Sequence, residues 1–119
     1  MAGVIAAGDV VFDDGVLRIV AWTEPPSVGL VLSGEADESG YQPLVKALAR
    51  LAGPDGSGPA EIHLDLSGLQ FCDAAALHAM IAPAGEGGRR VVLHRPAPAL
   101  QALIRITGWE ELPGLAVVN

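Results

Sequence analysis

The stretch "EIHLDLSGLQFCDAAALHAMIAPA", residues 61–84, contains the junction that decides the fold class. Residues 61–68 predict a strand. A short, mostly apolar turn follows and ends with Phe71 and Cys72. Residues 73–84 predict a helix, because alanine has the highest helix propensity. Asp73 stands between them, where its carboxylate can accept the free amide hydrogens of the first helical turn. The stretch therefore predicts a strand that passes into a helix behind a single carboxylate.

The residues before this junction predict a hairpin, a third strand and a first helix. Residues 9–12 and 16–22 are apolar runs joined by Asp-Asp-Gly, and Asp-Gly between apolar runs is a strong hairpin signal. Residues 28–34 predict the third strand. From about Ser39 the apolar period changes to that of a helix. Its start stays open between a capping box formed by Ser39 and Gln42 and a start at Gln42 itself, just before a proline.

The residues after the junction continue the alternation of strands and helices. Residues 53–59 predict a loop, 89–95 a strand, 98–108 a helix closed by a glycine, and 114–118 a last strand. Such alternation implies parallel pairing with right-handed crossovers, so the sequence predicts an α/β fold in one domain over residues 1–119.

Composition excludes several classes of partner. Fourteen acidic and seven basic side chains give a formal net charge of −7, so neither nucleic acid nor an anionic membrane is an expected partner. We find neither a secretory signal nor a charge-free apolar run near the roughly 18 residues of a membrane span, and expect no membrane insertion. The single Cys72 suits a reducing compartment, which predicts a cytoplasmic protein.

Chemistry-bearing motifs are not found in the sequence. Three histidines, His63, His78 and His94, lack metal-ligand spacing, and neither a phosphate-binding loop nor a GxSxG elbow occurs. The Cys72 thiol has a carboxylate beside it, which makes it less reactive. We therefore expect no catalytic residue, no metal, no cofactor and no enzyme activity.

Three segments resemble a known family in order and spacing. "VGLVLSGEAD" (28–37), "IHLDLSGLQFCDAAAL" (62–77) and "VVLHRPAPALQALIRITGWEEL" (91–112) resemble the STAS domain of anti-sigma factor antagonists, from about residue 28 to 118. The resemblance implies a mixed β-sheet of five or six strands with an N-terminal hairpin and helices mainly on one side. It also implies a protein-interaction module that binds an anti-sigma factor kinase, or a sensor-kinase-like partner, and so releases a sigma factor. A homodimer is compatible with it.

The sequence departs from the family pattern at the residue that matters most for regulation. The position of the phosphorylated hydroxyl residue, directly after the motif aspartate, is Ala74 here, followed by Ala75 and Ala76. Alanine has no oxygen to accept a phosphoryl group, so the phosphate switch is absent at this site. We expect either an always-on binder or regulation moved elsewhere, with Ser39 and Ser67 the nearest hydroxyls.

The expected partner-binding residues follow from this resemblance and each has a simpler structural explanation. They are Asp37, Ser39, Asp73, Ala74, Ala75, Ala76 and Leu77. Asp37 and Asp73 are equally suited to turns or caps, Ser39 to a cap, and the alanines to plain helix propensity.

Two other functions stay open at this point. The first is an accessory subunit of an ABC-type transporter, because some STAS domains dock on an ATPase subunit. The second is a nucleotide-binding sensor, which the negative charge and the missing phosphate loop disfavour.

Overall fold

The computed structural model describes residues 8–22, 28–53, 58–85 and 88–119, and most of the loop expected at 53–59 lies outside them. In these residues three strands come first and then helices alternate with three further strands, in the order that the sequence predicts. The strands are β1 (Val10–Asp13), β2 (Leu17–Ala21), β3 (Gly29–Ala36), β4 (Glu61–Cys72), β5 (Arg90–His94) and β6 (Leu115–Val118). The helices are α1 (Tyr41–Ala52), α2 (Ala74–Gly85) and α3 (Pro98–Thr107), with short 3₁₀ turns η1 (Glu38–Gly40) and η2 (Trp109–Glu111).

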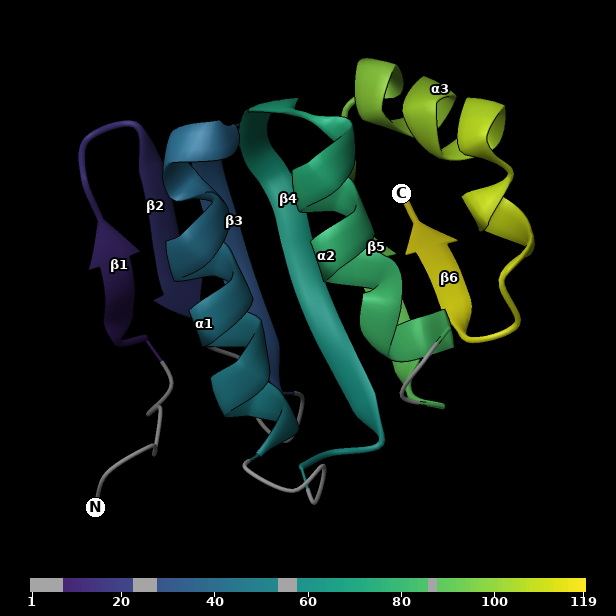
Figure 1. Ribbon diagram of the computed structural model, residues 1–119, viewed down its shortest axis with the longest axis horizontal. Coiled ribbons are helices and arrows are strands. Elements are labelled where there is room, and N and C mark those ends of the chain that lie inside the picture. The colour runs from purple at the N-terminus through teal and green to yellow at the C-terminus, as the bar shows by residue number, and fades with distance from the viewer. Residues whose placement is uncertain (1–7, 23–27, 54–57, 86–87) are drawn as a thin grey trace.

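The strands form one mixed sheet in sequence order, β1 to β6. β1, β2 and β3 pair antiparallel, whereas β3 to β6 pair parallel. Parallel neighbours need crossovers, which α1, α2 and α3 supply. Figure 1 shows α1 and α2 lying across the same face of the sheet. The predicted α/β class, mixed sheet and N-terminal hairpin are confirmed.

The core lies between that sheet face and the helices. Leu32 and Leu64 from the central strands, and Leu44 and Leu77 from the helices, are 0% exposed. Each such side chain stabilises the fold by about 1.5–3 kcal/mol relative to exposure. The buried side chains of this core are almost all aliphatic. No helix among the described residues is long and apolar enough to cross a membrane.

The hairpin between β1 and β2 forms as the Asp-Gly signal predicts. Asp14 accepts hydrogen bonds on one carboxylate oxygen from the backbone N–H groups of Val16 (2.9 Å) and Leu17 (2.8 Å). These two hydrogen bonds, of which the bond from Leu17 has the larger effect, lower the pKa of the Asp14 carboxyl. Gly15 has φ +84°, a left-handed conformation that glycine adopts without strain.

The turn expected at residues 69–72 is wrong. These residues form no turn, because β4 continues to Cys72 and pairs Ser33 with Gly68 and Ala36 with Cys72 across register shifts. The two arginines at the start of β5 differ in burial: Arg89 is 9% exposed and donates to the Ala52 carbonyl at 3.0 Å, whereas Arg90 is exposed.

Candidate functional site

Two helical segments begin side by side at one edge of the sheet. β3 and β4 are parallel neighbours that end in register, Ala36 opposite Cys72, and the N–H of Asp73 donates to the Ala36 carbonyl at 3.1 Å. The residues that follow the two strands, Asp37 and Asp73, are therefore brought together. Figure 1 shows η1 with α1, and α2, starting at this same edge.

Each of these aspartates caps the helical turn behind it. One carboxylate oxygen of Asp37 accepts bonds from the Ser39 N–H (3.0 Å) and the Ser39 hydroxyl (2.7 Å). One carboxylate oxygen of Asp73 accepts a bond from the Ala76 N–H at 2.8 Å, as predicted for an N-cap. Of the two starts left open for the first helix, the capping box of Ser39 and Gln42 does not form, because Ser39 donates to the Asp37 cap of η1. The helix α1 begins at Tyr41 behind Gly40, one residue before the alternative start at Gln42.

A groove of about 460 Å³ lies between the two helical starts, and we call it the helix-start groove. None of its lining residues is basic, and two are acidic, which complements a cationic group on a partner. Its lining residues are Glu38, Tyr41, Gln42, Asp73 and Ala75.

The alanines divide between surface and core. Ala74 and Ala75 are exposed at the start of α2, whereas Ala76 and Leu77 are 0% exposed. Ala76 and Leu77 were expected to contact a partner, and this needs correction, because their side chains face the sheet. The exposed surface at the start of α2 therefore consists of Ala74 and Ala75 behind the Asp73 carboxylate.

Several residues that sequence reasoning missed adjoin this surface. Glu38, Tyr41 and Gln42 line the helix-start groove, and Phe71 is 50% exposed at the end of β4. The only tyrosine of the chain, set at the start of a predicted helix, was a signal that could have been followed. No sequence signal marked Phe71 as exposed, because its exposure depends on the path of β4 in the folded protein.

Cys72 is half-buried beside the site and chemically quiet. Burial, and then the neighbouring Asp73 carboxylate, raise the pKa of the Cys72 thiol to about 12. The thiol is therefore protonated at neutral pH. Within the described ranges, no group of three or more His, Cys, Asp or Glu side chains is arranged to hold a metal ion.

This pKa gives a direct prediction for thiol chemistry. At pH 8 the native Cys72 should react with iodoacetamide about a thousandfold more slowly than in the urea-unfolded chain. The reason is that a pKa of about 12, in place of the ordinary 9.0, lowers the thiolate fraction by that factor. Mass spectrometry of quenched time points measures both rates. Equal rates in the folded and unfolded chains would contradict the assignment.

Comparison with known families and structures agrees with this architecture. The family model described as "Mlab, STAS domain" matches residues 22–117, which is most of the chain. This chain belongs to the STAS domain family. The matched residues run from the end of β2 to β6, so they include both helical starts of the candidate site.

Two solved structures similar to this STAS domain are of anti-sigma factor antagonists. One from Mycobacterium paratuberculosis has TM-score 0.67 and 19% identity, and the match covers 87% of this chain and 88% of the other. The antagonist SpoIIAA in its unphosphorylated form has TM-score 0.61 and 13% identity, with 85% and 87% covered. At these identities the likeness establishes the shared fold. No curated protein sequence matches the chain.

Proposed function

We propose that this protein is a non-enzymatic interaction module of the cytoplasm that binds an anti-sigma factor kinase, as anti-sigma factor antagonists do. The partner would contact the helix-start groove and the exposed Ala74 and Ala75 beside it. The two similar structures described above are of anti-sigma factor antagonists, which supports this class of partner.

The observation that carries the proposal is the combination of acidic groove and small apolar helix start. Glu38 and Asp73 carry negative charge in the groove, while Ala74 and Ala75 offer a flat apolar surface for close packing. A partner surface with a basic residue beside an apolar patch would complement both features. Ala74 further implies that the contact has no phosphate switch at that position.

Affinity capture from native cell extract tests the class of partner. The expected prey, identified by mass spectrometry, is an anti-sigma factor with an ATP-binding kinase domain. Capture of an ABC-type ATPase in its place would establish the transporter-subunit function instead. The excess over a bait carrying Ala74→Asp defines the specific prey, because that substitution is expected to destroy the proposed surface.

Phosphoryl transfer gives a second test. Incubation of the captured kinase with labelled ATP should leave the wild-type protein unlabelled, whereas Ala74→Ser restores a hydroxyl at the start of α2 and should accept label. Autoradiography with phosphosite mapping reads both. Stoichiometric labelling of the wild type at Ser39 or Ser67, which are both exposed, would show that another hydroxyl carries the switch.

A further inference from the structure

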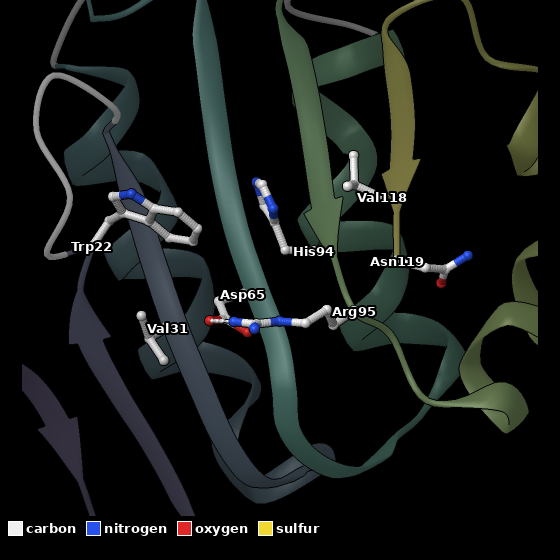
Figure 2. Close-up of a pocket in the computed structure, with 7 residues that line it drawn as sticks. All are labelled: Trp22, Val31, Asp65, His94, Arg95, Val118 and Asn119. Atoms are coloured by element: carbon white, nitrogen blue, oxygen red, sulfur yellow. Dashed lines mark hydrogen bonds and ion pairs between the residues drawn. The ribbon is translucent and has the colours of Figure 1, made fainter.

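The face of the sheet opposite α1 and α2 has a second hollow that the proposed function does not use. Figure 2 shows it from that side, with the helices behind the strands. We call it the open-face hollow; its volume is about 300 Å³. It shares no lining residue with the helix-start groove. The residues lining it are Trp22, Val31, Asp65, His94, Arg95, Val118 and Asn119.

Arg95 is held in place over this hollow from both ends. Its backbone is left-handed, φ 53°, the one positive value among the described non-glycine residues, and its N–H donates to the Val118 carbonyl at 2.6 Å. Its Nη2 donates to an Asp65 carboxylate oxygen at 2.8 Å. Figure 2 shows the side chain reaching from the end of β5 across β4 to Asp65. Non-glycine residues rarely adopt such a backbone, and where they do it is often at binding sites.

Asp65 pairs with only one nitrogen, Nη2, of the Arg95 guanidinium. The Arg95 side chain is 62% exposed, and its Nε and Nη1 have no hydrogen-bond partner within the part of the chain that the structure describes. Asp65 is 9% exposed and remains ionised: burial raises its pKa, but bonds from Ser67 and then Arg95 outweigh burial and hold the pKa below its usual value. Arg95 therefore presents a fixed donor edge that matches one further carboxylate.

The remaining walls combine aromatic and aliphatic side chains with the polar side chains of His94 and Asn119. The Trp22 ring lies 4.9 Å from the His94 ring and 5.6 Å from the His63 ring, measured between centroids. Nε2 of His94 is 2.8 Å from Nδ1 of His63, whose Nε2 donates to Glu61 at 2.7 Å. This chain of contacts fixes His94 against Trp22. Val31 and Val118 complete a surface suited to a flat or aliphatic body.

From this arrangement we infer that the open-face hollow binds a small organic monocarboxylate, whose carboxylate pairs with Arg95 while its apolar body packs against Trp22, Val31 and Val118. The ionised Asp65 next to Arg95 repels a second negative charge, so a dicarboxylate is disfavoured. A neutral amide of the same shape lacks the charge that pairs with the guanidinium.

Benzoate and benzamide, which share shape and differ in charge, test the proposal. The Trp109→Phe background leaves Trp22 as the sole tryptophan, so its fluorescence reports binding directly. Benzoate should give a saturable change, with at least about tenfold weaker binding for benzamide and for phthalate. Arg95→Gln should weaken benzoate at least about tenfold. Arg18→Gln, an exposed arginine outside the hollow, should leave it unchanged.

Three results would overturn the inference. They are the absence of saturation up to about 10 mM benzoate, equal affinity for benzoate and benzamide, and unaltered affinity in a folded Arg95→Gln variant. If circular dichroism shows that Arg95→Gln does not fold, the inference is tested by comparing benzoate with benzamide on the protein with Arg95 intact.

Discussion

Ala74→Asp should fold normally and lose partner affinity by about 100-fold, which corresponds to about 3 kcal/mol. Ala74 is the first residue of α2, where a carboxylate is favourable to the helix by about 0.3–1 kcal/mol. The same carboxylate would have to be desolvated in an apolar contact, which costs several kcal/mol. Binding and folding should therefore change in opposite directions.

Two control variants isolate the surface from general effects of charge. Ala60→Asp adds the same charge at an exposed alanine ahead of β4, outside the helix-start groove, and should bind as the wild type does. Ala74→Ser should also bind, because the hydroxyl is small and uncharged. Biolayer interferometry with the purified partner measures all three. Equal losses with Ala74→Asp and Ala60→Asp would place the contact elsewhere.

Gly34→Ala should lower the free energy of unfolding by at least about 3 kcal/mol, a large part of the 5–15 kcal/mol typical of a domain. Gly34 has φ +90°, and a Cβ built there overlaps the carbonyl oxygen of Val16. That oxygen also accepts the Glu35 N–H at 2.9 Å, so a shift of β2 would strain the sheet as well as the residue. Backbone strain and steric overlap therefore add.

Gly15→Ala is the matched control for this prediction. Gly15 has φ +84°, yet a Cβ there meets nothing within 4 Å, so its substitution should cost only the strain of about 1–2 kcal/mol. Urea denaturation followed by circular dichroism gives both values. The steric explanation fails if Gly34→Ala is no more destabilised than Gly15→Ala.

The fold was largely predictable because each element carries a local signal. Asp14 and Gly15 formed the expected hairpin, and Gly108 ends α3 in a left-handed conformation as a closing glycine should. Residues 69–72 of β4 were missed, because Ser67 and Gly68 directly before them favour a turn locally. Pairing with an extended β3, with Ala36 opposite Cys72, keeps residues 69–72 in the strand, and this long-range effect has no local signature.

The site was predictable only as far as sequence order allows. Asp73 was placed correctly as a cap, because capping is local. The burial of Ala76 and Leu77 could not be separated from the exposure of Ala74 and Ala75, because four apolar residues in a row do not show which face meets the sheet. The open-face hollow needed the pairing of strands that lie far apart in sequence.

Photo-crosslinking from the start of α2 tests the central claim most directly. p-Benzoylphenylalanine at Ala75, in the helix-start groove, should crosslink to the anti-sigma factor kinase. p-Benzoylphenylalanine at Ala49, an exposed residue two turns after the start of α1, should not crosslink to this kinase. Equal crosslinking from both positions, or crosslinking from Ala49 alone, would contradict the account.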